Sequence, residues 1–187
     1  MTTIAAVEGE NWAVVGYDSR VSVIDPAGRI YTMPKSSGKL TKNGEYLIAT
    51  AGDLRVLNIL SYVFKPPVIP RANTNLDKFM VSTFIPALKE CLEEHSVSKD
   101  GEHGALLIVA VRGRVYEIGE QFEWCADTRG MYAIGSGESY ALGALYALLP
   151  KKPTLEEAKS CVKQAIEIAA QLDPGTGLPI TVITNKI

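Results

Sequence analysis

A threonine stands second in the chain, directly after Met1, and that position gives it chemical interest. Once Met1 is removed, Thr2 carries a hydroxyl and a free α-amine on one residue, and the amine can act as the base for its own hydroxyl. A free α-amine has a pKa of about 7.7–8.0, so it can accept that proton close to neutral pH. Without supporting residues, Thr2 would be an ordinary polar residue at a frayed chain end.

The composition excludes several other classes of function. The chain has 187 residues, enough for one domain with a substantial core, and we expect a single domain over residues 1–187. Hydrophobic residues make up 47% and charged residues 21%, which is typical of a globular protein. A formal net charge of -2 without a long basic run favours neither a nucleic-acid nor a membrane partner. No apolar run approaches the roughly 18 residues that cross a bilayer, and no basic segment at the N-terminus indicates a secretory signal.

The cysteines and histidines lack the spacing of a metal site. Cys91, Cys125 and Cys161 are far apart and odd in number, which predicts reduced, mostly buried thiols in a cytosolic protein. A cysteine nucleophile usually relies on a nearby base such as histidine, so a catalytic cysteine is disfavoured. We expect His95 and His103 on the surface, around a polar loop. The sequence thus predicts no metal ion and no cofactor.

Hydrophobic patterns predict the strands that would position Thr2. Residues 2–8 and 12–19 read as two strands around a short turn, and the second is almost wholly apolar until Asp18, as in a strand buried on both faces. Asn43-Gly44 predicts a hairpin turn, because both positions tolerate φ > 0. Further strands are expected at 105–111, 114–118, 122–126, 131–134 and 179–184.

Four helices are expected in two pairs. The first pair spans 53–64 and 75–95, where Pro86 should kink or shorten the second helix. The second pair consists of 138–149 and a helix that begins at the capping box Thr154-Leu155-Glu156-Glu157. Grouped strands and grouped helices argue against a parallel βαβ fold. They favour an α+β fold, a four-layer αββα sandwich of two antiparallel sheets with a helix pair on each outside.

Several short motifs, in this order, resemble those of the β-subunits of the 20S proteasome and their simpler bacterial relatives. These relatives are N-terminal-nucleophile (Ntn) hydrolases. The motifs are Thr2-Thr3-Ile4, Asp18-Ser19-Arg20, Lys39-Leu40, Thr50-Ala51-Gly52, Ile134-Gly135-Ser136-Gly137, and Asp173 followed by Thr176. Each motif is weak alone, but their order and spacing over nearly the whole length are specific. The resemblance is to relatives with almost no propeptide, since Met1 alone precedes Thr2.

The resemblance implies catalytic roles around the N-terminus. Thr2 matches the family nucleophile. Lys39 matches the lysine whose positive charge favours a neutral amine and the developing alkoxide, and Lys35 competes for this role. Asp18 would pair with Lys39, because a buried lysine needs a counter-charge. Taken alone, these two would be a solvated strand lysine and a turn aspartate.

The remaining site residues also follow from the resemblance. Gly52 matches the position whose backbone N–H binds the oxyanion, although it also begins the helix at 53. Ser136, Asp173 and Thr176 match the residues that support the nucleophile's amine, with Thr176 in place of a serine; alone, the segment after Asp173 would be a plain turn.

Four residues are expected near the substrate. Leu54 occupies the neighbourhood that lines the specificity pocket, with Ser22 and Thr50 close to it, which predicts a modest and mainly apolar pocket. Arg20 either lines the substrate cleft or is structural.

The implied function is that of a threonine-type endopeptidase subunit in a self-compartmentalised, proteasome-like assembly. Methionine aminopeptidase would expose Thr2, and peptides or unfolded proteins would be the substrates. The resemblance further implies a homo-oligomeric ring, an ATPase unfoldase as partner and a cytoplasmic location. Two alternatives stay open: a catalytically silent structural subunit, and an Ntn amidase that acts on a small amide.

Overall fold

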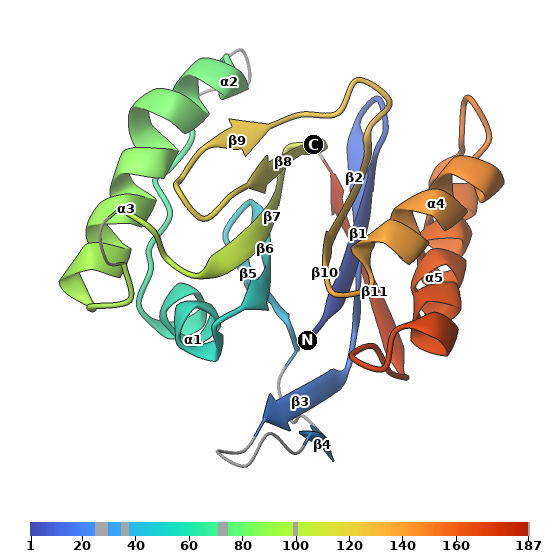
Figure 1. Ribbon diagram of the computed structural model, residues 1–187. Helices are drawn as coiled ribbons and strands as arrows, with labels where there is room; N and C mark the ends of the chain where they lie inside the picture. Colours follow the sequence, from blue (N-terminus) through green and yellow to red (C-terminus); the bar gives the residue numbers. More distant parts are fainter. Residues whose placement is uncertain (25–29, 35–37, 71–74, 99–100, 187) are drawn as a thin grey trace.

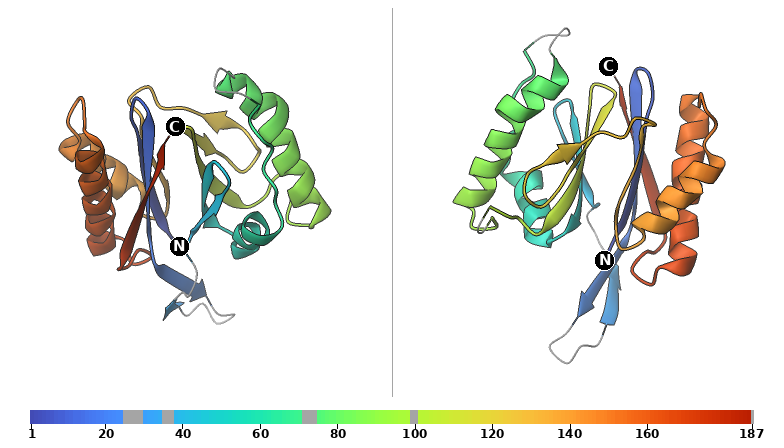
Figure 2. Two further views of the ribbon diagram at one scale, coloured as in Figure 1. Left: turned by 180° about the vertical axis from the view of Figure 1, so that it is seen from behind. Right: turned by 45° about the horizontal axis from the view of Figure 1, so that its top comes forward.

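The computed structural model describes residues 1–24, 30–34, 38–70, 75–98 and 101–186 as two stacked antiparallel sheets with helices outside them. Figures 1 and 2 show these four layers edge-on, which confirms the predicted αββα sandwich. One sheet has the order β10(Met131–Gly135), β1(Thr3–Glu8), β2(Trp12–Asp18), β11(Ile180–Lys186). The other has the order β5(Leu40–Asn43), β6(Tyr46–Gly52), β7(Ala105–Val111), β8(Arg114–Ile118), β9(Trp124–Cys125).

The helices cover the two outer faces in the expected pairs. Helices α4(Glu138–Leu148) and α5(Leu155–Leu172) lie on the sheet that contains β1 (Figure 1). The other face is covered by α1(Leu54–Tyr62) and by one helical segment made of α2(Leu76–Phe79), η1(Met80–Phe84) and α3(Ile85–Glu94). The capping box of α5 is confirmed, since Thr154 and Glu157 exchange side-chain-to-backbone hydrogen bonds.

Strand β1 explains why the N-terminal segment is apolar on both faces. Ile4 and Ala6 face the core between the sheets, whereas Ala5 and Val7 pack in the cluster beneath α4 and α5. All four side chains are fully buried. Because successive side chains of a strand point to opposite faces, only a strand covered on both sides needs such a run. The strand that carries Thr2 is therefore fixed from both sides.

The predicted hairpin turn needed correction. The loop of the β5–β6 hairpin is Gly44–Glu45, with Gly44 at φ +60°, and not Asn43-Gly44. Asn43 ends β5, where its side-chain amide donates to the carbonyl of Phe64 at 2.8 Å. The helix expected over 75–95 is divided into α2, η1 and α3, and it continues past Pro86, which lies in the first turn of α3 directly after the five-residue π-helix η1.

The segment after Asp18 contains an additional hairpin. Strands β3(Arg20–Ile24) and β4(Ile30–Pro34) form a two-stranded antiparallel ribbon, which extends beyond the sandwich at the end where the N-terminus lies (Figure 2). The burial of one histidine and two cysteines differs from the sequence prediction. His103 is 2% exposed and not on the surface; its Nε2 lies 3.1 Å from the carbonyl oxygen of Gly119. Of the cysteines, only Cys161 is buried, while Cys91 is half-buried and Cys125 is exposed.

Across the described ranges, no helix combines the length and apolar character needed to cross a membrane.

Candidate active site

Strand pairing holds Thr2 at the edge of the sandwich. Thr3 pairs with Gly135 at the end of β10, so Thr2 lies next to the turn that follows this strand. Gly135 has φ +97°, and a Cβ there would lie 2.1 Å from the carbonyl oxygen of Thr2, so the close approach requires glycine. Thr2 is 7% exposed; its N–H donates to Ser136 Oγ at 3.3 Å and its hydroxyl to the carbonyl of Met1 at 2.7 Å.

A buried ion pair lies beside Thr2. Lys39 Nζ is 2.5 Å from Asp18 Oδ1, and the two side chains are 3% and 0% exposed. The same ammonium donates to the carbonyl of Met1 at 3.5 Å, which places it next to the Met1–Thr2 peptide bond. Burial lowers the pKa of Lys39 from its ordinary range, although the charge of Asp18 acts in the opposite direction. Lys35 lies outside the described residues.

The Asp18 carboxylate accepts four hydrogen bonds. Besides Lys39, its donors are the backbone N–H groups of Thr3 at 2.9 Å, Arg20 at 3.0 Å and Gly177 at 3.0 Å. A fully buried carboxylate is tolerated when its oxygens are satisfied in this way. Asp18 therefore joins three separate segments around Thr2.

A second polar group approaches Thr2 from the other side. Ser136 Oγ donates to Asp173 Oδ2 at 2.7 Å, and Thr176 Oγ1 donates to the same oxygen at 2.6 Å. The N–H of Gly175 donates to Oδ1 of the carboxylate at 3.0 Å. Burial alone would raise the pKa of Asp173, but the hydrogen bonds from Thr176, Ser136 and Gly175 outweigh it, so the pKa is lowered. The carboxylate is thus held in its ionised, hydrogen-bond-accepting form.

Thr3 connects the two groups, and sequence reasoning assigned it no role. Its N–H binds Asp18, and its Oγ1 lies 2.5 Å from Thr176 Oγ1. The side chain is 0% exposed. The available signal was a hydroxyl at the start of an otherwise apolar strand, because a buried hydroxyl needs a partner.

A small cavity opens beside Thr2. It has a volume of about 60 Å³, and Ser22, Thr50, Gly52 and Leu54 are among its lining residues. The structure thus brings together three of the four residues expected near the substrate. The lining also contains Lys39 and Asp53, so the cavity is not mainly apolar as predicted.

Arg20 does not line this cavity. Its guanidinium donates to the carbonyl of Pro174 at 2.8 Å, and its side chain packs so closely on Gly177 that a Cβ there would lie 2.5 Å from Nε. Of the two readings of Arg20, these contacts favour a structural one.

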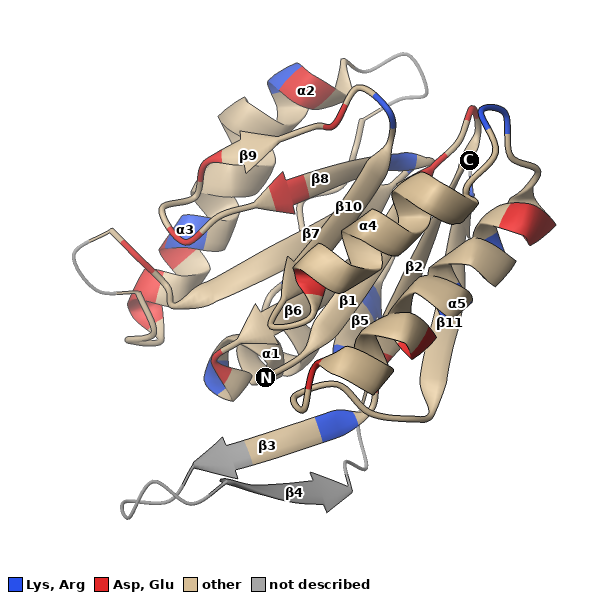
Figure 3. Ribbon diagram, turned by 45° about the vertical axis from the view of Figure 1, so that its right-hand side comes forward, with Lys and Arg blue, Asp and Glu red and all other residues tan. Residues whose placement is uncertain are grey.

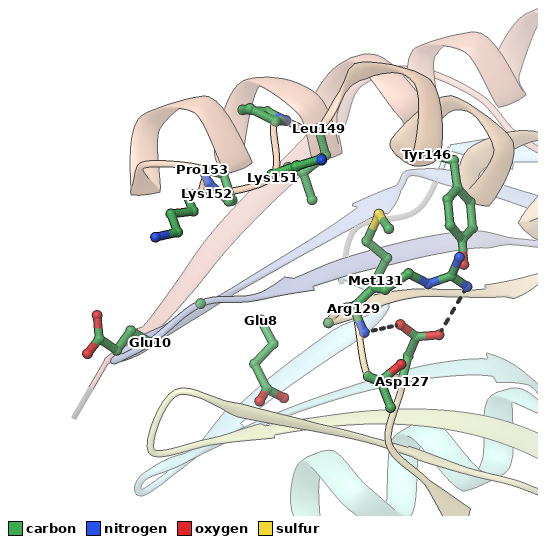
Figure 4. Close-up of a pocket in the computed structure, with 14 residues that line it drawn as sticks. Glu8, Glu10, Asp127, Arg129, Met131, Tyr146, Leu149, Lys151, Lys152 and Pro153 are labelled. Carbon is green, nitrogen blue, oxygen red and sulfur yellow. Dashed lines mark hydrogen bonds and ion pairs between the residues drawn. The ribbon is translucent and has the colours of Figure 1, made fainter.

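A larger cavity of about 890 Å³ lies at the far end of β1 from Thr2 (Figure 4). It lies where the β1–β2 turn, the loop before β10 and the α4–α5 connection meet, with Glu8, Arg129 and Lys152 among its lining residues. Its charges are partly paired internally, since Arg129 contacts Asp127 at 3.5 Å and stacks 4.0 Å from the ring centre of Tyr146. None of the predicted catalytic residues lines it.

Comparison with known proteins gives a consistent picture. The ATP-dependent protease subunit HslV of Caldicellulosiruptor saccharolyticus is 31% identical over 185 residues, covering 97% of this chain and 97% of the relative. The proteasome subunit beta 1 of Pyrobaculum arsenaticum is 29% identical over 200 residues, covering 98% and 89%. No family model matches the chain.

Solved structures share the fold. Thiobacillus denitrificans BPH in complex with epoxomicin superposes with a TM-score of 0.78 at 22% identity, covering 99% of this chain and 98% of that one. Eukaryotic HslV from Trypanosoma brucei gives a TM-score of 0.68, also at 22% identity, with 100% of both chains covered. The resemblance that the sequence motifs indicated is confirmed by relatives and fold together: this chain belongs to the HslV and proteasome β-subunit family of N-terminal-nucleophile threonine proteases.

Proposed function

We propose that this chain cleaves peptide bonds with Thr2 as its nucleophile after removal of Met1. The observation that carries the proposal is the position of the buried Lys39–Asp18 pair, with Lys39 Nζ 3.5 Å from the carbonyl of Met1. A buried lysine is costly to maintain, and this one lies against the bond whose cleavage creates the nucleophile. While Met1 is attached, the nitrogen of Thr2 belongs to an amide and cannot accept a proton.

The chemistry then proceeds in two steps. The free amine of Thr2 takes the proton of Oγ1, and Oγ1 attacks the substrate carbonyl. The resulting oxyanion is bound by the backbone N–H of Gly52, at the end of β6. Collapse breaks the peptide C–N bond, the amine returns the proton to the leaving nitrogen, and an ester to Thr2 remains. Water, activated by the same amine, hydrolyses this ester and restores Thr2.

The two polar groups have separate tasks in this scheme. The Lys39 cation favours the neutral form of the nearby amine and stabilises negative charge on Oγ1, while Asp18 fixes its position. On the other side, Ser136 orients the amine, and Asp173 with Thr176 orients Ser136 through the 2.7 Å and 2.6 Å hydrogen bonds.

The named relatives support an assembly as well as an activity. One is an ATP-dependent protease subunit and others are proteasome subunits. By analogy, the active assembly is a homo-oligomeric ring that takes peptides or unfolded proteins, and an ATPase unfoldase supplies the latter. Helix α4 suits such packing, because its only charged residue is Glu138 (Figure 3) and Tyr140, Tyr146 and Leu148 are exposed on it. A cytoplasmic location stays a prediction.

The test compares wild type with Thr2→Ala, after intact mass confirms that Met1 is absent from both. Wild type should cleave fluorogenic peptides, and Thr2→Ala should lose at least about 10³-fold in rate, as expected when a nucleophile is removed. Thr2→Ser should retain measurable activity because it keeps both functional groups. Equal cleavage by Thr2→Ala would refute the proposal, and a processed but inactive wild type would favour the silent structural subunit.

A further inference from the structure

Two hydroxyl groups beside Thr2 lack hydrogen-bond partners. Ser22 Oγ and Thr50 Oγ1 are both buried atoms without a partner in the described part of the chain. Both residues line the 60 Å³ cavity, and so do Met1 and Thr2. Thr50 is 4% exposed, so its hydroxyl has no ready access to bulk water. Buried polar atoms are normally satisfied, and each exception calls for an explanation.

The strand register aims Thr50 away from the core between the sheets. On β6, Leu47, Ala49 and Ala51 belong to the inter-sheet cluster, whereas Ile48 belongs to the cluster beneath the helices. Thr50 follows the alternation of Ile48 and therefore points to the α1 side of the sheet. Leu57 of α1 lines the cavity on that side and is 4% exposed.

This cavity lies where a substrate side chain must go. If Oγ1 of Thr2 attacks a carbonyl whose oxygen turns toward Gly52, the reacting carbon lies between these two residues. The side chain on the same substrate residue then starts within one bond of that carbon. Thr2 and Gly52 both line the cavity, so it is the space next to the start of that side chain.

We propose that this cavity selects a short side chain with a hydroxyl, that of threonine or serine, on the residue that supplies the scissile carbonyl. This inference rests on the proposed function of Thr2. A hydroxyl can donate to one of the orphan oxygens and accept from the other, whereas an apolar side chain of equal size leaves both unpaired. Sites built to bind a hydroxyl discriminate strongly against analogues that lack it.

The bounds of the cavity and the charges in its lining further restrict which substrate side chains it can bind. The cavity measures about 60 Å³ while Met1, which is part of its lining, is attached. Val21 and Leu57 also bound it and are only 8% and 4% exposed, so these two side chains limit the room for a large substrate side chain. Among the charged groups in its lining, Lys39 is already paired with Asp18, whereas the exposed carboxylate of Asp53 keeps its negative charge while it accepts the N–H of Arg55 at 2.8 Å. An anionic substrate side chain would therefore find no free counter-charge at Lys39 and would be repelled by Asp53, so burying it would be costly.

The experiment measures kcat/KM of Met1-free wild type for peptides that differ only at the residue before the scissile bond. Threonine and valine form one pair of nearly equal shape, and serine and alanine form the other. The threonine peptide should exceed the valine peptide about tenfold or more, and serine should exceed alanine similarly. A ratio of one or below in both pairs, with cleavage intact, overturns the inference and leaves the proposed function standing. No cleavage of any peptide overturns both.

Two variants test which hydroxyls are responsible. Thr50→Val and Ser22→Ala should each reduce the threonine-to-valine ratio several-fold toward one, chiefly because the valine peptide is cleaved better. Thr184→Val is the matched control, since it removes the hydroxyl of a half-buried strand threonine that does not line the cavity. The control should keep the wild-type ratio. An unchanged ratio in both cavity variants contradicts the assignment, and the wild-type comparison remains decisive if a variant fails to fold.

Discussion

The ammonium of Lys39 lies 2.5 Å from the carboxylate of Asp18, and this pair links the two sheets of the sandwich. Asp18 ends β2 in one sheet, whereas Lys39 directly precedes β5 in the other. Neither side chain reaches solvent to more than 3%. The pair therefore fixes the edge of the sandwich at which Thr2 lies. Breaking it should lower both the free energy of unfolding and the rate of peptide cleavage.

Replacing Asp18 by asparagine should cost both stability and activity. The variant keeps the shape but leaves the buried Lys39 cation without a counter-charge, and breaking one side of a buried pair costs about 3–5 kcal/mol. Chemical denaturation gives the change in the free energy of unfolding, and peptide cleavage gives the loss of activity.

Two controls separate burial from charge. Lys163→Met removes one partner of an exposed pair, Lys163–Glu167, and should change the free energy of unfolding by less than about 1 kcal/mol. The double variant Asp18→Asn with Lys39→Met removes both buried charges, so it should recover stability relative to Asp18→Asn while remaining inactive. If Asp18→Asn were as stable as Lys163→Met, the buried pair would not hold the edge together.

The pH dependence of cleavage should report the lowered pKa of Lys39. Activity should rise with pH as the Thr2 amine loses its proton, in a range near or below its ordinary pKa of about 7.7–8.0. It should fall again as Lys39 loses its charge, below the ordinary lysine pKa of about 10.4, because burial lowers the pKa of this group. The kcat/KM profile measured from neutral to alkaline pH locates both limbs.

Stability distinguishes this alkaline limb from simple unfolding. The folded-state pKa of Lys39 lies below its unfolded value, so between the two values the unfolded chain binds more protons. The contribution of Lys39 to the free energy of unfolding therefore increases with pH in this window while activity falls. Thermal unfolding over the same pH series checks this. An alkaline limb that coincides with the loss of folded protein would contradict the assignment to Lys39.

Sequence patterns could predict most of the architecture, because the spacing of apolar residues shows which faces of a strand or helix are buried. The apolar run of β2 before Asp18 and the capping box at Thr154 both have local physical causes, and the structure confirms both predictions. The β3–β4 hairpin was missed because the sequence between its strands, Asp25-Pro26-Ala27-Gly28-Arg29, has no two-residue turn signal such as Asn-Gly. The π-helix before Pro86 was missed because a proline predicts that the α-helical pattern is interrupted, but not how the backbone absorbs the interruption.

Local sequence patterns predict the candidate site less well than they predict the fold, because its residues are far apart in the chain. Asp18 and Lys39 are 21 residues apart, and Ser136 and Asp173 are 37 apart, so only a family resemblance could group them. Thr3 was missed because its partners, Asp18 and Thr176, come from distant segments. Leu54 suggests a mainly apolar cavity, but Ser22 and Thr50 reach the same lining because β3 and α1 meet β6 there, and the sequence does not show this meeting.

Thr176 offers a test of the hydrogen-bond chain that supports Ser136. Thr176→Val keeps the shape but removes the 2.6 Å hydrogen bond to Asp173 and the contact with Thr3. The buried Oγ1 of Thr3 then loses its partner, and Asp173 Oδ2 keeps only Ser136 as a donor. This should cost about 1–3 kcal/mol in stability, and we expect at least about a tenfold loss in kcat/KM. Thr176→Ser restores the hydroxyl and should retain most activity. Equal rates for the valine and serine variants would show that the hydrogen bonds from Thr176 do not support catalysis.

Gly52 is expected to tolerate no side chain, for reasons of both backbone and space. Its φ is +120°, and a Cβ would lie 2.6 Å from the carbonyl oxygen of Gly104 and 2.9 Å from the Cα of Ala105. Gly52→Ala should therefore lower the free energy of unfolding by more than about 2 kcal/mol and displace the backbone next to Thr2.

Gly44→Ala is the matched control, because Gly44 also has positive φ, at +60°, but nothing lies within 4 Å of its Cβ position. That variant should lose only about 1 kcal/mol and keep full activity. Since Gly52 lines the cavity beside Thr2 and Gly44 lies at the opposite end of β6, cleavage should fall steeply in the first variant alone. Equal activity of the two variants, measured well below their unfolding temperatures, would remove Gly52 from the proposed oxyanion site.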